Sequence, residues 1–167
     1  MKIDPLTLKE NPFFLIGKDW MLVAAQKPDG TSNMMTASWG GMGVLWHRNV
    51  CFVFVRPQRY TYEFCEQSDT MTLSFFDESY RDALKFCGTK SGRDFDKAKE
   101  TGLTKLTDGP YVTFAEARLT FKVKKLFATT IDEADFIDKA VLEDSYPQRD
   151  FHKMYVCEIV EIEEREA

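Results

Sequence analysis

The sequence predicts an α+β domain, mainly β, in which short helices surround an antiparallel sheet or barrel. Six segments have the apolar content or alternation of strands, and the helical segments between them do not alternate regularly with those strands. The chain also holds 14 Phe, 6 Tyr and 3 Trp, and strands favour such aromatic side chains. Its 167 residues match the length of one domain, so we expect residues 1–167 to form a single domain.

The first three predicted strands lie in the N-terminal third of the chain. Residues 20–25 are apolar and lead into a turn at residues 27–30. Residues 33–39 return as the second strand, and both of its faces carry side chains that a neighbour could cover. Residues 50–55 are apolar on both faces, so we expect the core to cover one face and another layer or subunit to cover the other.

The other three predicted strands span residues 70–76, 117–124 and 153–162. In the segment 117–124, apolar residues alternate with polar ones that include Lys122 and Lys124. This alternation is typical of a half-buried strand, so we expect the lysines to lie on a solvated face.

Four short helices are predicted between the strands. Thr61 can cap the first, a capping box that begins at Ser79 precedes the second, and Gly102 closes the third. The expected ranges are 61–67, 79–88, 94–101 and 133–142.

Composition argues against several classes of function. Because 22 basic and 27 acidic residues give a net charge of −5 without a local basic stripe, we expect no nucleic-acid partner. No segment approaches the roughly 20 apolar residues of a membrane span, so we expect a cytoplasmic protein with no membrane partner. Four scattered cysteines without a C-x-x-C pair and two separated histidines favour reduced thiols and no metal site.

The segment Arg56-Pro57-Gln58-Arg59-Tyr60-Thr61 carries the strongest chemical signal. It follows a buried strand and places two guanidinium groups just before a helix, where backbone N–H groups and arginine donors can converge on a phosphate. The alternative is a pair of surface arginines around a proline turn.

Two other segments could contribute to a ligand site. Residues 33–41 join small hydroxyl side chains and Trp39 to glycines that permit close approach of a flat polar ring. The alternative, which this segment alone favours, is a core strand with a glycine-rich turn in which Trp39 only packs. Lys97 lies near the start of a predicted helix, where a cation is unfavourable unless a bound phosphate is near. Otherwise Lys97 is an exposed lysine.

Four motifs, taken together and in order, resemble the flavin reductase family of FMN-binding split barrels, especially its flavoredoxin-like members. The resemblance covers about residues 12–162. The motifs are N-x-M-T-x-S-W-G-G from Asn33, R-P-x-R-Y-T from Arg56, S-G-R-D-x-D-K from Ser91 and H-x-M-Y-V from His152.

The resemblance implies a six-stranded antiparallel split β-barrel that forms a homodimer, with one FMN per subunit at or near the dimer interface. By matching position, the flavin ring and ribityl chain would meet Asn33, Thr36, Ala37, Ser38 and Trp39. The phosphate side would be held by Arg56, Arg59, Tyr60 and Thr61, with Ser91, Gly92 and Lys97 contributing from the following helix. His152 would lie where the last strand approaches the flavin, or would serve as a structural histidine.

The activity that the resemblance implies is that of a flavin oxidoreductase, which passes electrons from NADH or NADPH through FMN to flavin or another small-molecule acceptor. The alternative is a non-enzymatic flavoredoxin-type electron-transfer protein that a partner protein reduces. Because the cofactor carries the chemistry, we expect no proton-transferring catalytic residue.

Overall fold

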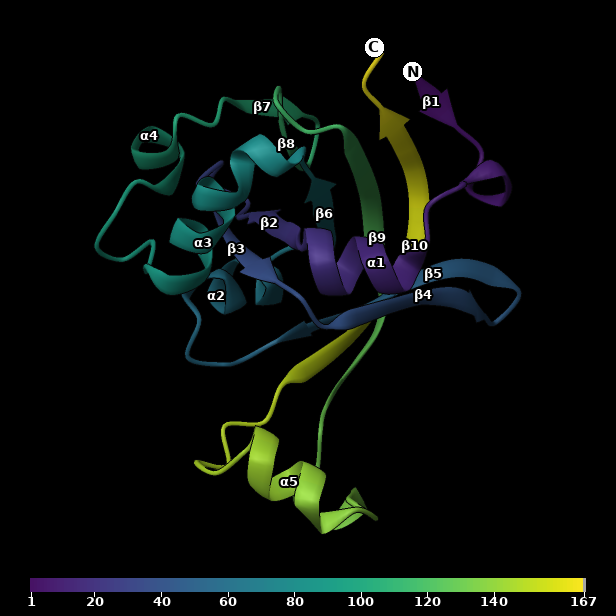
Figure 1. The fold of residues 1–167 in the computed structure, drawn as a ribbon, viewed down its shortest axis with the longest axis vertical. Coiled ribbons are helices and arrows are strands. Elements are labelled where there is room, and N and C mark those ends of the chain that lie inside the picture. Colours follow the sequence, from purple (N-terminus) through teal and green to yellow (C-terminus); the bar gives the residue numbers. More distant parts are fainter. Residues whose placement is uncertain (167) are drawn as a thin grey trace.

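Ten strands are present among residues 1–166, which are the part of the chain that the computed structural model describes (Figure 1). They are β1 (Lys2–Ile3), β2 (Met21–Gln26), β3 (Ser32–Ala37), β4 (Gly40–Leu45), β5 (Arg48–Val55), β6 (Thr70–Phe75), β7 (Lys105–Asp108), β8 (Tyr111–Phe114), β9 (Leu119–Thr130) and β10 (Lys153–Glu164). Eight of them form one antiparallel sheet in the order β3-β2-β6-β9-β10-β5-β4, with β1 paired to β10. The remaining two, β7 and β8, form a separate hairpin.

The edge strands of the large sheet, β3 and β4, are joined by Ser38 and Trp39 alone. A two-residue link spans at most about 10 Å, so the sheet must curl until its edges come close. Within the described residues no hydrogen-bonded ladder joins β3 to β4, and the barrel is therefore split along this line. The predicted class, a mainly β fold with an antiparallel split barrel, is confirmed, although the sheet has more than the six strands expected.

The helices lie at the periphery. They are α1 (Pro12–Phe14), α2 (Tyr60–Glu66), α3 (Arg81–Thr89), α4 (Lys97–Thr101) and α5 (Lys139–Ser145), with 3₁₀ turns at Pro5–Thr7, Glu78–Tyr80 and Glu133–Asp135 and a π-helical turn at Leu15–Asp19. α2, α3 and α4 gather on one side of the barrel, whereas α5 stands apart beyond the other end of β9 and β10 (Figure 1). None of these described helices has the length and apolar content to cross a membrane.

Two apolar clusters hold the fold together. The larger fills the barrel and includes Val23, Phe121 and Tyr155. The second lies on the opposite face of β2 and β3, where Leu22 and Met34 belong to the same cluster as residues of α3 and β8. Successive residues of β2 and β3 point to opposite faces, and each face packs in one of the two clusters. This burial on both sides holds the chain in place just before the split.

All six predicted strands are confirmed, and β4 is the main strand that sequence reasoning missed. We predicted no strand at residues 40–45 and weighed a glycine-rich turn only for the segment that ends at Gly41, but residues 40–45 pair with β5 in a hairpin. The hairpin turn consists of Trp46 and His47, which both have positive φ values of 53° and 58°. Two-residue turns of this kind normally carry Asn-Gly or Asp-Gly, so the usual hairpin signal is lacking.

β5 is covered more completely on one face than on the other. Cys51, Val53 and Val55 are buried in the barrel core, as predicted. On the opposite face Val50 is buried but Phe52 and Phe54 are only half-buried, so residues 1–166 supply the expected second layer over only part of β5.

The helix boundaries required correction. Thr61 does not cap α2: Arg59 occupies the cap position, and the buried Thr61 hydroxyl accepts a hydrogen bond of 2.9 Å from Asn33 Nδ2. α4 begins at residue 97 rather than 94, because the Asp96 side chain accepts from the backbone N–H of Lys99. The spacing of apolar residues does not show which polar side chain caps a helix, so it could not separate the role of Thr61 from that of Asp96.

Two other helix predictions were also inaccurate. The predicted helix 79–88 is a 3₁₀ turn followed by α3, which begins at Arg81 without a side-chain cap. The segment 133–142 is a 3₁₀ turn and the separate helix α5, which Asp138 caps through the backbone N–H of Ala140.

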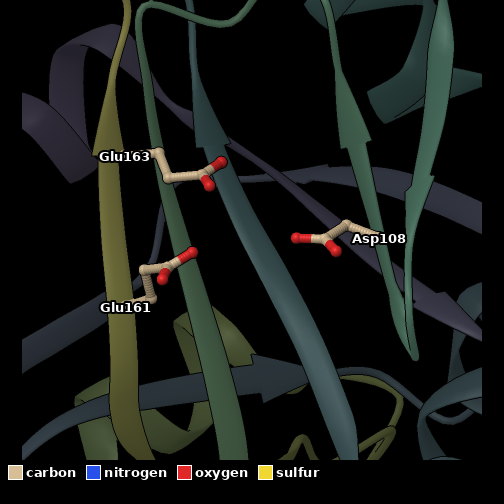
Figure 2. A group of neighbouring side chains, drawn as sticks. All are labelled: Asp108, Glu161 and Glu163. Atoms are coloured by element: carbon tan, nitrogen blue, oxygen red, sulfur yellow. The ribbon is translucent and has the colours of Figure 1, made fainter. Parts of the chain in front are cut away.

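Lys122 is buried, which contradicts the solvated face expected for β9. Its side chain is 4 % exposed, and its Nζ lies 2.5 Å from Asp108, 2.7 Å from Glu161 and 2.8 Å from Glu163. Figure 2 shows that these three carboxylates point toward one another from β7 and β10. Such a cluster resembles a cation site, but the ammonium of Lys122 lies within hydrogen-bond distance of all three groups and balances their charge.

Candidate functional site

A hollow of 190 Å³ lies where the barrel is split. Its wall runs along the end of β3, across the link to β4, and then to the end of β5 and the start of β10. Its lining residues are Met35, Thr36, Ala37, Ser38, Trp39, Phe54, Arg56, Arg59 and His152. Seven of these nine were predicted as site residues, so the structure brings distant parts of the predicted set together.

Trp39 and Thr36 differ in how much they can offer a ligand. Trp39 is 50 % exposed although it belongs to the link that crosses the split. The Thr36 hydroxyl donates a hydrogen bond of 2.6 Å to the carbonyl oxygen of Leu84 and thereby ties β3 to α3. The indole therefore presents a flat apolar surface to the hollow, whereas the Thr36 hydroxyl already serves the fold.

Arg56 is held by the segment that precedes β10. Its guanidinium donates to the Asp150 carboxylate at 2.6 Å and to the Ser145 carbonyl oxygen at 3.1 Å. It also lies 5.1 Å from the centre of the Tyr146 ring. Arg56 thus fastens residues 145–150 to the wall of the hollow, and most of its charge is balanced within the protein.

Arg59 and Lys97 are two cations that meet at one carbonyl group. Both donate to the carbonyl oxygen of Cys87, at 3.1 Å and 3.0 Å, and Lys97 also donates to the Met34 carbonyl oxygen at 2.8 Å. Cys87 lies in the last turn of α3, where the helix dipole favours positive charge. Within residues 1–166, neither cation has a carboxylate partner.

Burial without a counter-ion disfavours the charged forms of these two groups. It lowers the pKa of Arg59, and burial together with the Arg59 charge lowers the pKa of Lys97 to about 8. Lys97 is therefore not the exposed lysine that we weighed as the alternative: it is buried, and its ammonium donates to carbonyl groups of α3 and β3. An anion placed beside the pair would favour both charges.

His152 closes the hollow from the start of β10. Its ring lies 5.2 Å from the Trp39 ring and 6.4 Å from the Phe54 ring, measured between centroids. Burial, followed by the charge of Arg56, lowers the pKa of His152 to about 4. The imidazole is therefore neutral at neutral pH.

A second hollow of 330 Å³ contains much of the remaining predicted set. Asn33, Tyr60, Gly92 and Lys97 line it. Gly92 approaches β3 so closely that an added Cβ would lie 2.2 Å from the Asn33 side-chain oxygen, so only glycine fits without displacing Asn33. Arg59 lines the first hollow and Lys97 the second, and their shared hydrogen-bond partner Cys87 connects the two.

Two predicted residues do not line either hollow. Thr61 is buried and accepts a hydrogen bond from Asn33, which lines the second hollow. Ser91 accepts a hydrogen bond from the backbone N–H of Arg93 and shapes the turn that leads to Gly92. Thr61 and Ser91 therefore support residues that line the site, but they do not line it themselves.

Sequence reasoning missed Phe54 and the residues behind the wall. Phe54 could have been found, because it lies two residues before Arg56 and so projects from the same face of β5. Asp150 and Tyr146 had no such signal, because they belong to a connection whose path the sequence does not reveal.

The comparisons with known proteins agree with this architecture. Residues 15–167 match the family model described as "Flavin reductase like domain". No curated protein sequence matches the chain.

Among solved structures, the chain is similar to flavoredoxin of Desulfovibrio vulgaris (Miyazaki F), with 20 % identity, a TM-score of 0.69, and coverage of 99 % of this chain and 78 % of that one. The FMN-binding protein from Thermus thermophilus is 17 % identical with a TM-score of 0.68, and 99 % of this chain and 79 % of that chain are covered. The styrene monooxygenase flavin reductase from Pseudomonas putida S12 is 13 % identical with a TM-score of 0.65, covering 89 % of this chain and 80 % of that chain.

At these identities the similarity to solved structures shows only that the fold is shared. The match to the family model shows the family, because it covers almost the whole sequence and includes β2 to β10. The chain therefore belongs to the flavin reductase-like family.

Proposed function

We propose that this chain is an FMN-binding oxidoreductase that takes electrons from NADH or NADPH and passes them to a flavin or another small acceptor. The observation that carries the FMN assignment is the pair Arg59 and Lys97, two partly or fully buried cations without a carboxylate partner in the described chain, beside an exposed tryptophan. Family membership and the FMN named for similar structures support the same cofactor.

The residues at the split suit the parts of FMN. Arg59 and Lys97 would hold the phosphate, because its charge would offset theirs. Trp39 and His152, with the backbone of residues 36–38, would contact the flavin ring. When bound, FMN supplies the hydride and electron chemistry, while the protein binds it, orients it and leaves a donor access to it.

The function is tested by loading the purified protein with FMN and recording its absorption spectrum before and after adding NADH or NADPH under anaerobic conditions. We expect stoichiometric FMN and loss of the oxidised flavin bands with at least one nicotinamide. Retained FMN that neither nicotinamide reduces would instead favour the electron-transfer protein that depends on a protein donor. Failure to take up FMN would reject the assignment altogether.

We propose further that two copies of the chain assemble around the cofactor. The hollow at the split is smaller than the roughly 300 Å³ of typical small-molecule sites, so one chain covers only part of a ligand as large as FMN. Exposed apolar side chains continue from it over α1 and β4, including Phe13, Trp39 and Val44. Sedimentation of the FMN-loaded protein tests this proposal, and a monomer at micromolar concentration would refute it.

The affinity for FMN is expected to fall about tenfold for each pH unit above about pH 8. The pKa of Lys97 is lowered to about 8, and a phosphate dianion would raise it, so binding would take up a proton above that pH. Below it, Lys97 is charged in both states and the affinity stays constant. Fluorescence titration from about pH 7 to about pH 9.5 measures this slope.

Riboflavin provides the control for this pH dependence, because it lacks the phosphate. Its affinity should stay flat over the same interval, and the variant Lys97→Met should lose the slope for FMN. An FMN affinity that does not change up to about pH 9.5 would exclude Lys97 from the phosphate site.

A further inference from the structure

Tyr146 lies behind His152, outside the hollow. Its phenol oxygen is 2.7 Å from His152 Nδ1, and the two residues are 4 % and 8 % exposed. The Tyr146 ring packs against Phe136 and Phe151, which fixes its position.

The pairing restricts where the His152 ring can carry its hydrogen. A neutral imidazole has one N–H group and one acceptor nitrogen. If Nδ1 carried the hydrogen, it would donate to the Tyr146 oxygen, and the phenol hydrogen would need another acceptor. The backbone N–H of His152 also faces the phenol oxygen but can only donate, and the described chain shows no second acceptor for the phenol hydrogen. A buried unpaired O–H group costs about 1–3 kcal/mol.

The other arrangement satisfies both groups. Tyr146 then donates its hydrogen to Nδ1, and Nε2 of His152 carries the ring hydrogen. Since His152 lines the hollow and Nδ1 is already engaged, Nε2 is the nitrogen left for a ligand. In this arrangement the Nε2–H group of His152 is the donor available to a ligand in the hollow.

The charged groups around the pair keep this arrangement neutral. Arg56 lies over the Tyr146 ring from the end of β5, and Asp150 faces Arg56 from the connection before β10. The carboxylate is 2.6 Å from the guanidinium and so is already paired, which leaves it unable to compensate a charged imidazole fully. Burial also raises the pKa of the Tyr146 phenol, so the hydroxyl keeps its hydrogen.

We propose that Tyr146 is a positioning residue that fixes His152 in the neutral form with its hydrogen on Nε2, so that the site donates to an acceptor atom of the flavin ring. The identity of the ligand rests on the proposed function. The state of the His152 ring does not, because it follows from contacts in the chain without a ligand.

The state of the ring is tested first, in the protein without FMN, by nitrogen NMR of labelled histidine. The chain has two histidines, and the variant His47→Gln assigns the remaining signals to His152. We expect the pattern of an imidazole protonated on Nε2 alone at neutral pH. In Tyr146→Phe, which removes only the hydroxyl, the pattern should become a mixture of the two neutral forms. Protonation on Nδ1 in the unmodified protein would overturn the proposal.

The ligand contact is tested second, by FMN titration. Tyr146→Phe should raise the dissociation constant for FMN about three- to tenfold, the effect of weakening one hydrogen bond. His152→Gln retains an N–H donor, and in that background Tyr146→Phe should change the constant by less than about twofold, because Tyr146 acts only through His152.

The two tests fail in distinguishable ways. If FMN does not bind at all, the proposed function fails while the NMR result still decides the state of His152. If the NMR pattern is as expected but Tyr146→Phe weakens FMN equally with and without His152, Tyr146 supports the structure and does not position the donor.

Discussion

Arg59→Ala is expected to weaken FMN binding about 30- to 100-fold while changing riboflavin binding by less than about threefold. Charged hydrogen bonds contribute about 1.5–3 kcal/mol, and Arg59 has no carboxylate in the described chain that would already use its charge. Riboflavin has the same ring and ribityl chain as FMN but no phosphate. Fluorescence titration of both ligands measures the difference.

Arg56→Ala is the matched control for this prediction. Arg56 lines the same hollow, but its guanidinium is paired with Asp150 and the Ser145 carbonyl group. Removing it should loosen the wall formed by residues 145–150 and weaken FMN and riboflavin by similar factors. Equal losses for both ligands in Arg59→Ala would remove Arg59 from the phosphate site, and a phosphate-specific loss in Arg56→Ala would assign the role to the wrong arginine.

The contrast between these two arginines shows what a local pattern can and cannot predict. Their sequence context placed both beside a strand end and a helix start, and the structure confirms that placement. The pattern could not distinguish them, because the groups that engage Arg56 lie 89 and 94 residues away. Apolar runs and alternation likewise predicted six of the strands but not β4, half of whose residues are glycines without a side chain.

Lys97 and Lys122 show the same limit for buried charge. A lysine in a polar context is usually exposed. We expected Lys122 on a solvated face, and Lys97 to be exposed unless a bound phosphate lies near it. Lys97 is buried because two backbone carbonyl groups accept its hydrogens. Lys122 is buried because carboxylates 14, 39 and 41 residues away converge on it. Such partners become neighbours only through the order of strands in the sheet.

Lys122→Met is expected to destabilise the fold by about 3 kcal/mol at neutral pH. Removing one partner of a buried ion pair costs about 3–5 kcal/mol, and the lower end applies because Asp108 is 67 % exposed and water can solvate it. The loss arises because three carboxylates from β7 and β10 would face one another without the ammonium (Figure 2). Urea denaturation of both proteins measures it, and Lys124→Met, at an exposed position of the same strand, should cost less than about 0.5 kcal/mol.

The difference between Lys122→Met and the unmodified protein should shrink in acid. Lys122 and then Lys2 lower the pKa of Glu161 to about 2 in the folded state. A carboxyl group with a lowered pKa adds stability that is fully present above its unfolded pKa and is lost as the pH falls toward the folded value. The unmodified protein should therefore lose this stability between about pH 4.5 and about pH 2, whereas the variant has lost most of it already and gains from protonation of the crowded carboxylates. A difference that stays constant across this interval would show that Lys122 stabilises the fold through packing of its carbon chain rather than through its charge.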